Sequence, residues 1–184
     1  MGCVANILFA ILEFCAMALV TVGTPLDQLR TKSLDKQEVF NAKGCLNYWG
    51  YKTDCYGTKY EAKTSDNLFI GCDGRQSRFK AASACAIIAI CCLAVGFVLA
   101  IITCSCSTCC PCCKYILMLL SIAGFVTAMI AWAIMLDAYL QKIGSGEVFC
   151  TKLKEGMNIG TGWVLTIVGS AVALVNAFVI LIPC

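Results

Sequence analysis

The sequence has no histidine, little charge and little proline. Of its 184 residues, 14% are charged and three are proline. Without histidine, Ser-His and Cys-His nucleophiles, HExxH zinc sites and histidine proton relays are excluded. The chain also contains no Walker loop and no GxGxxG fingerprint. We therefore expect no enzymatic activity and no cofactor.

Clustered positive charge is missing as well. The formal net charge is only +3, and the basic residues are mixed with acidic ones along the chain. A nucleic-acid-binding surface would need lysines and arginines gathered on one face. We therefore expect no nucleic-acid partner.

Apolar residues are what the chain has in excess. They make up 60% of the sequence, and the mean hydropathy is +0.82. They gather in blocks of about twenty residues, enough for a helix to cross roughly 30 Å of hydrocarbon. We predict membrane spans at residues 4–23, 81–103, 115–136 and 159–182, the first retained because it lacks a basic n-region and a cleavage site. The predicted fold is a single all-α domain in a lipid bilayer, a four-helix bundle.

The connections between these spans are unequal, and they set the topology. Residues 24–80 form a large loop, 104–114 a short hairpin loop and 137–158 a second loop on the side of the large one. Ten basic residues lie in the large loop, three in the second loop and only Lys114 on the hairpin side, which favours a cytoplasmic large loop. However, a loop near sixty residues is at the limit of that rule, and paired cysteines suit an oxidising compartment. We place both loops outside and both termini in the cytoplasm.

Two cysteines ten residues apart mark the centre of the large loop. Cys45 and Cys55 enclose a Trp-Gly pair among alternating apolar and polar residues. This pattern predicts a short hairpin tied by a disulfide, with a pair of free thiols as the alternative. Cys72 and Cys150 lie one in each outer loop, and a second disulfide between them would join these loops.

The segment from Cys45 to Cys55 resembles the signature of the amastin family of trypanosomatid surface proteins. That signature has Cys, an apolar residue, Ser or Thr, Leu or Phe, Trp or Phe, Gly, any residue, Lys, Arg or Gln, any residue, an acidic or small polar residue, and Cys. The segment departs from it at Asn47, where a hydroxyl residue is expected, and at Tyr48, where Leu or Phe is expected. The principal matching residues are Cys45, Trp49, Gly50, Lys52, Asp54 and Cys55.

The resemblance implies a multi-pass plasma-membrane protein at the cell surface with no settled molecular activity. Amastins are similar in architecture to claudins and peripheral myelin proteins, which carry a small extracellular sheet beside a four-helix bundle. Amastins are often glycoproteins, yet no Asn-X-Ser/Thr sequon occurs in this chain. A tetraspanin would carry its large loop between spans three and four, whereas here it follows span one.

Three functions stay open from the sequence. The first is surface interaction or membrane organisation, in which the loop contacts a host membrane component, a neighbouring protein or a second copy of the chain. Its contact residues would be Tyr48, Trp49, Tyr51, Tyr56, Lys52 and Lys59. Alternatively, Trp49 and Gly50 only fold the loop against the bundle. The other two functions are claudin-like adhesion or pore formation and small-ion or proton transport.

Glu13 is the candidate residue for transport. It lies near the middle of the first span, where a charge costs at least a few kcal/mol. Helical rise brings it to a depth similar to that of Asn176 in the antiparallel fourth span. We predict a buried hydrogen bond between the two side chains, and the alternative is a carboxylic acid on a proton or ion path.

The hairpin loop is rich in cysteine. S-palmitoylation is our preferred interpretation of this run, with thiolate zinc binding and inert reduced thiols as alternatives. Gly2 and Cys3 weakly resemble a myristoylation and palmitoylation start, although Asn6 occupies the position where Ser or Thr is expected. The candidate acylation sites of the hairpin are Cys104, Cys106, Cys109, Cys110, Cys112 and Cys113.

Overall fold

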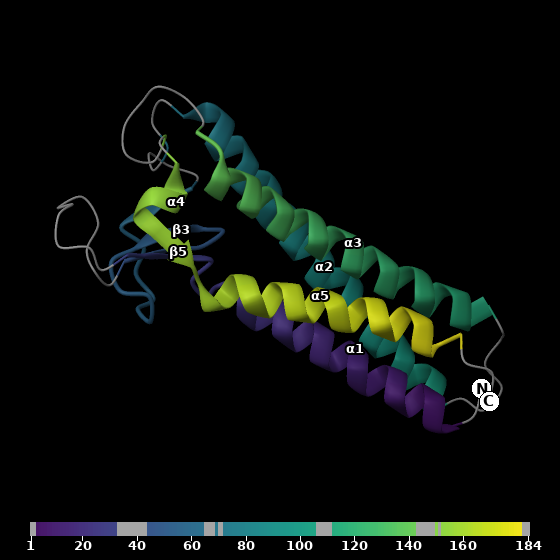
Figure 1. The fold of residues 1–184 in the computed structure, drawn as a ribbon. Helices are drawn as coiled ribbons and strands as arrows, with labels where there is room; N and C mark the ends of the chain where they lie inside the picture. The colour runs from purple at the N-terminus through teal and green to yellow at the C-terminus, as the bar shows by residue number, and fades with distance from the viewer. Residues whose placement is uncertain are drawn as a thin grey trace.

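Four long helices run side by side, and a small sheet with one short helix covers one end of them (Figure 1). The computed structural model describes residues 3–32, 44–64, 69, 72–105, 112–142, 150 and 152–181. The long helices are α1 (Cys3–Gly23), α2 (Asp73–Ser105), α3 (Cys112–Leu140) and α5 (Thr161–Val179). Each is long and apolar enough to cross a membrane. The predicted four-helix membrane bundle is confirmed.

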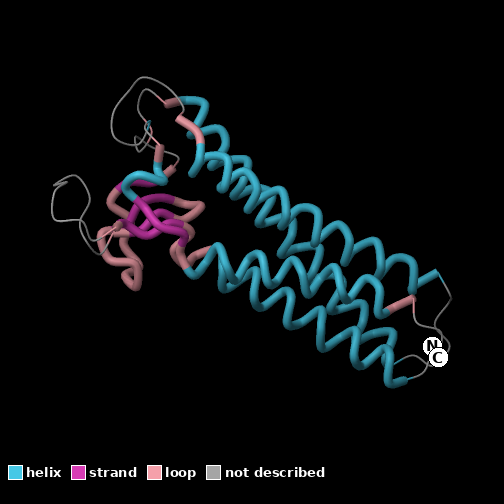
Figure 2. The backbone as a smooth tube through the Cα atoms, in the orientation of Figure 1, coloured by secondary structure: helices cyan, strands magenta, loops and turns pink. Residues whose placement is uncertain are grey.

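Five short strands form one antiparallel sheet in the order β4-β3-β2-β1-β5 (Figure 2). They are β1 (Leu29–Thr31), β2 (Cys45–Leu46), β3 (Gly50–Lys52), β4 (Ala62–Lys63) and β5 (Met157–Ile159). The short helix α4 (Leu153–Gly156) leads directly into β5. Because β5 pairs with β1, with Arg30 opposite Asn158, the sheet combines both predicted outer loops. We call the five strands, α4 and the two segments that join β2 to β3 (residues 47–49) and β3 to β4 (residues 53–61) the sheet module.

Several helix boundaries differ from the predicted spans, and the contacts explain two of these differences. α2 begins at Asp73 rather than at residue 81. Its first turns are polar, but they pack on α3: the Arg75 guanidinium donates from Nη2 to the Gln141 carbonyl at 2.8 Å, and Arg78 forms an ion pair with Asp137. The last helix begins at Thr161 rather than at residue 159, because the backbone of Ile159 pairs with Leu29 in the sheet.

A disulfide joins the start of α2 to the segment before α4. It links Cys72 to Cys150 across 78 residues, with their Cα atoms 5.6 Å apart. Both cysteines are buried in the apolar cluster that also contains the sheet residues Leu29 and Leu46. The bond therefore ties the sheet module to the α2–α3 pair.

The bundle core consists of three apolar clusters along its length. The first extends from the sheet into α2 and α3, with Phe79 and Met135 among its members. The second and third lie further from the sheet; the second combines residues of all four long helices, and the third combines residues of α1, α2 and α3 with the residue that follows α5. Their members are Ala16, Val20, Ala89, Leu93, Ala128 and Ala173 in the second and Phe9, Ala100, Leu117 and Ile180 in the third.

Candidate functional site

The β2–β3 hairpin is closed by the side chain of Asn47. Its Oδ1 accepts hydrogen bonds from the backbone N–H groups of Trp49 and Gly50, both at 3.0 Å. Its own backbone N–H donates to the Gly50 carbonyl at 3.0 Å. This is an Asx turn, which a serine or threonine hydroxyl reproduces more weakly. The departure of Asn47 from the amastin signature therefore preserves the turn.

The aromatic residues of this hairpin are mostly interior, so the expectation of a contact surface there is wrong in part. Tyr48 is 0% exposed and Tyr51 8%, and both belong to the cluster that joins the sheet to α2 and α3. Trp49 is half-buried and packs against the same cluster. A Cβ on Gly50 would lie 2.3 Å from the Ala62 carbonyl oxygen, so only glycine lets β3 approach β4 here. The alternative interpretation, in which Trp49 and Gly50 fold the loop, describes these contacts better.

Cys45 and Cys55 are buried next to one another in the sheet module. Burial raises the pKa of the Cys45 thiol, and the neighbouring Cys55 thiol raises it further. The two thiol groups are therefore close neighbours in the sheet module. Their oxidation to a disulfide stays a prediction.

The remaining polar residues of the signature, Lys52 and Asp54, lie at the base of the loop between β3 and β4, residues 53–61.

 Lys52 donates from Nζ to the Gly57 carbonyl at 3.0 Å and lies over the Tyr60 ring, 4.7 Å from its centroid. Asp54 accepts from the Tyr56 N–H at 3.1 Å through Oδ1 and from the Gly57 N–H at 3.0 Å through its carbonyl. These contacts make Lys52 and Asp54 internal supports of the loop, so the expectation that Lys52 offers its charge to a partner is wrong.

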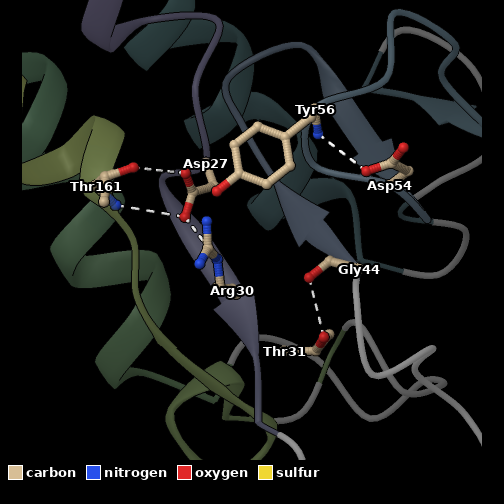
Figure 3. Close-up of polar contacts among 7 residues, drawn as sticks. All are labelled: Asp27, Arg30, Thr31, Gly44, Asp54, Tyr56 and Thr161. Atoms are coloured by element: carbon tan, nitrogen blue, oxygen red, sulfur yellow. Dashed lines mark hydrogen bonds and ion pairs between the residues drawn. The ribbon is translucent and has the colours of Figure 1, made fainter.

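Tyr56 is the large side chain that this loop leaves in solvent. It is 82% exposed. The Arg30 guanidinium, on β1, lies 6.0 Å from the centre of its ring. The two side chains point toward one another beside Asp27 (Figure 3). Lys59, further along the loop, is also exposed. We call Arg30, Tyr56 and Lys59 the Tyr56 patch.

Asp27 connects the sheet module to the bundle, and the sequence analysis did not single it out. Its carboxylate accepts from the Thr161 hydroxyl at 2.7 Å and the Thr161 N–H at 3.4 Å, at the first residue of α5 (Figure 3). It also pairs with Arg30 at 3.1 Å. A carboxylate is favourable at a helix N-terminus because the backbone N–H groups there lack partners. An acidic residue shortly after one span is too weak a sequence signal to predict this contact.

The neighbouring backbone completes the junction. Gln28 donates from Nε2 to the Gly23 carbonyl at the end of α1, at 2.7 Å. The Gly160 N–H donates to the Gln28 carbonyl at 2.8 Å, and the Gly162 N–H donates to the Asp27 carbonyl at 2.9 Å. The end of α1, the start of β1 and the start of α5 are thus joined through two adjacent residues. The sheet module is held rigidly on the bundle.

A second polar site lies inside the bundle, around Glu13. The Glu13 side chain is 0% exposed, and its Oε2 lies 2.6 Å from Asn176 Nδ2 on α5 and 3.1 Å from Ser121 Oγ on α3. A Cβ on Gly96 of α2 would lie 2.6 Å from Oε1. All four long helices therefore meet at this carboxyl group.

The sequence analysis named Glu13 and Asn176 but not their two neighbours. Ser121 is one hydroxyl among many serines and threonines, and Gly96 is one glycine of 15 in the chain. Residue type alone does not separate either from residues that face lipid. Only the angular position of each helix about its axis, which packing sets, turns these two toward Glu13.

The hairpin cysteines are described only in part. Cys104 is exposed at the end of α2 and Cys113 is half-buried near the start of α3, while Cys112 is described only as part of the helix. Cys106, Cys109 and Cys110 lie outside the described residues, as does Gly2, and Cys3 is described only as the first residue of α1.

Cys104 also lines an apolar groove of about 430 Å³ between α1 and α2. Among the residues that the structure describes, no three acidic, histidine or cysteine side chains gather as metal ligands.

Comparison with known proteins agrees with this architecture. A search among curated proteins found no match to the chain. A sequence model of the amastin surface glycoprotein family matches residues 14–180, which include α2, α3, α5, the second half of α1 and the whole sheet module. With four membrane-spanning helices and a disulfide-linked sheet module at one end, the chain belongs to the amastin family of surface glycoproteins.

Proposed function

We propose that the chain is a non-catalytic surface protein that binds a partner through the Tyr56 patch. The observation that carries this proposal is the 82% exposure of Tyr56 on a loop whose base is fixed by hydrogen bonds. A large aromatic side chain at such a position gives up contact with water when a partner covers it. The partner is a component of a neighbouring membrane or a second copy of this chain.

The rigidity of the loop supports this function. Binding normally costs free energy because loops and side chains must be ordered in the complex. Here the loop is already ordered by the hydrogen bonds of Lys52 and Asp54, and Asn47 donates from Nδ2 to the Tyr60 hydroxyl at 3.1 Å. Because binding has little further ordering of this loop to do, most of the free energy gained from the contacts contributes to affinity.

The residue types in the Tyr56 patch also support a role in binding a partner. Tyrosine and arginine are the residue types enriched at the centres of protein interfaces. Arg30 keeps 41% of its side chain exposed although it pairs with Asp27. Asp54 and Glu61 are exposed nearby, so the patch carries both signs of charge. Such a surface suits a protein partner better than a uniformly anionic lipid surface.

The function requires the sheet module to lie on the outer side of the membrane, with both termini in the cytoplasm. The Cys72–Cys150 disulfide supports this orientation because such bonds persist in oxidising compartments. The surface-protein family of the chain supports it too.

Photocrosslinking on intact cells tests the proposal. Tyr56 is replaced by a photoreactive phenylalanine analogue in the full-length chain, and adducts are identified by mass spectrometry after illumination. We expect protein adducts at position 56, because a bound partner would cover this side chain. An adduct between two copies identifies self-association, and an adduct to another protein identifies a heterologous partner.

The matched control is the same replacement at Tyr115, an exposed tyrosine at the opposite end of the bundle. We expect position 115 to give lipid adducts or none. The proposal is overturned if position 56 gives no protein adduct in chains that reach the cell surface. It is equally overturned if the adducts at the two positions are the same.

A further inference from the structure

We infer that Glu13 is a proton-binding site in the core of the bundle, in which a protonated carboxyl group donates its hydrogen to the Ser121 hydroxyl. This inference is independent of the Tyr56 patch. It concerns a polar layer between the two apolar clusters of the bundle that lie further from the sheet.

Three oxygen atoms stand in a row inside the bundle. Glu13 Oε2 lies 3.1 Å from Ser121 Oγ, and Ser121 Oγ lies 2.9 Å from the Ala173 carbonyl oxygen. Each contact is at hydrogen-bond length and needs a proton between the two oxygens. A serine hydroxyl supplies one proton, and a backbone carbonyl supplies none. A protonated Glu13 supplies the second proton, whereas an ionised Glu13 would leave one serine hydrogen shared between two acceptor oxygens.

The contact with Asn176 agrees with this count. Nδ2 lies 2.6 Å from Glu13 Oε2, which is shorter than the usual N–H···O distance and typical of O–H···O bonds. With the amide as placed, Nδ2 donates to the hydroxyl oxygen of the acid.

The other carboxyl oxygen fits a neutral acid better than a carboxylate. Glu13 Oε1 has no hydrogen-bond partner among the described residues, and it packs against the α2 backbone at Gly96. An unpartnered oxygen costs far more free energy when the buried group is charged. A protonated acid leaves a carbonyl oxygen there, which is the less costly group.

No positive charge compensates Glu13 in the described part of the chain. The two ion pairs there, Arg30 with Asp27 and Arg78 with Asp137, lie at the sheet end. On the neighbouring helices, the only titratable side chain within one turn of Gly96, Ser121 or Asn176 is the thiol of Cys92. A bound proton is thus what neutralises this carboxyl group in the membrane interior.

Proton binding here couples directly to helix packing. The protonated acid connects α1 to α3 through Ser121 and to α5 through Asn176, while α2 closes on it at Gly96. Loss of the proton would remove the donor to Ser121 and leave a charge among four helices. The bundle is therefore tightest in the protonated state.

Infrared spectroscopy of the full-length chain in lipid vesicles tests the inference. Near pH 7, solvated carboxyl groups with pKa values of about 4 are ionised and show no band of a protonated acid. We expect such a band in the wild type, its loss in Glu13→Gln, and its retention in Glu61→Gln, which changes an exposed glutamate. In Ser121→Ala we expect the band at higher frequency, because the acid loses its hydrogen-bond acceptor.

Isotope labelling keeps the test valid even if Glu13→Gln does not fold. In wild-type chain with ¹³C-labelled glutamate the protonated-acid band should shift, and all glutamates other than Glu13 lie outside the long helices. The proposal is overturned if the wild type has no such band near neutral pH, or if the band does not respond to glutamate labelling. A band that stays in place in Ser121→Ala overturns the assignment of Ser121 as acceptor.

Discussion

Two tyrosine hydroxyl groups in the sheet module have opposite surroundings. Tyr60 receives a hydrogen bond from Asn47, at 3.1 Å. The Tyr48 hydroxyl is buried and has no hydrogen-bond partner among the described residues, although the Thr166 hydroxyl lies nearby. Phenylalanine is one of the residues that the amastin signature expects at position 48, which fits an apolar site. Replacing tyrosine by phenylalanine should therefore have opposite effects on the stability of the protein at these two positions.

We predict that Tyr48→Phe raises the melting temperature of the purified chain in detergent, whereas Tyr60→Phe lowers it. The reason is that burying an unpartnered hydroxyl costs about 1–3 kcal/mol, while a satisfied hydrogen bond contributes about 1 kcal/mol. Thermal unfolding followed by tryptophan fluorescence measures both variants. A decrease of similar size in both would mean that the Tyr48 hydroxyl has a hydrogen-bond partner in the folded protein.

The same substitution has a consequence for pH dependence. Burial raises the pKa of the Tyr48 phenol, so the folded chain holds this proton more tightly than the unfolded chain does. The resulting stability is fully present below about pH 10, the ordinary pKa of tyrosine, and is lost as the pH rises through the higher pKa of the folded state. Tyr48→Phe should therefore lose less stability than the wild type in strongly alkaline solution.

At the scale of elements, the sheet module is attached to the bundle at two separate places. One is the junction of Asp27 and Gln28 with the ends of α1 and α5. The other is the Cys72–Cys150 disulfide, next to α2 and α4. One attachment involves α1 and α5 and the other lies at the start of α2, so the two join the sheet module to different helices of the bundle.

Removing the disulfide should destabilise the sheet module. We predict that Cys72→Ser combined with Cys150→Ser lowers the free energy of unfolding by about 2–4 kcal/mol, because the unfolded chain regains the entropy of a long open loop. The control is Cys15→Ser combined with Cys91→Ser, which removes two exposed thiols. Unfolding in denaturant, with and without reductant, measures both pairs. If reductant destabilises the wild type no more than the Cys72/Cys150 variant, the disulfide has no such role.

The α2–α3 hairpin should carry fatty acyl chains. Cys104 lines the apolar groove between α1 and α2, where an attached chain would be shielded from water. We predict hydroxylamine-sensitive lipid labelling of the wild type in cells. It should disappear when Cys104, Cys106, Cys109, Cys110, Cys112 and Cys113 are all changed to Ser, and persist in the Cys15/Cys91 variant. Labelling that survives the six changes would place the acyl groups elsewhere.

At the scale of the whole molecule, the asymmetry between the two ends of the bundle should reflect the two sides of the membrane. The described residues include the sheet module and the disulfide at one end of the bundle, and the end of α2 and the start of α3 at the other (Figure 1). Cys45 and Cys55 are 1% and 9% exposed, so they are poor reporters of topology. An engineered thiol at the exposed residue Thr58 is a better one.

We predict that Thr58→Cys is labelled by an impermeant maleimide on intact cells, because the proposed orientation puts this position on the outer side of the membrane. Cysteines of the hairpin, including Cys104, should be labelled only after permeabilisation and hydroxylamine treatment. The wild-type chain without the added thiol controls for background. The opposite pattern would invert the topology and exclude the proposed role of the Tyr56 patch at the cell surface.

Composition and pattern alone determined the class of this protein. Four apolar blocks of membrane-spanning length, unequal connections and the segment from Cys45 to Cys55 were sufficient to predict a four-helix membrane bundle of the amastin family. These features are local in sequence, and the physics behind them, hydrocarbon thickness and turn chemistry, does not depend on distant residues.

Tertiary structure decided which side chains face one another. It turned Tyr48 and Tyr51 inward and left Tyr56 in solvent, because the packing of the sheet module against α2 and α3 decides which aromatic side chains are covered. It added β5 to the sheet from a loop more than a hundred residues away from β1. It brought Gly96 and Ser121 to Glu13, since packing alone sets how each helix is rotated about its axis.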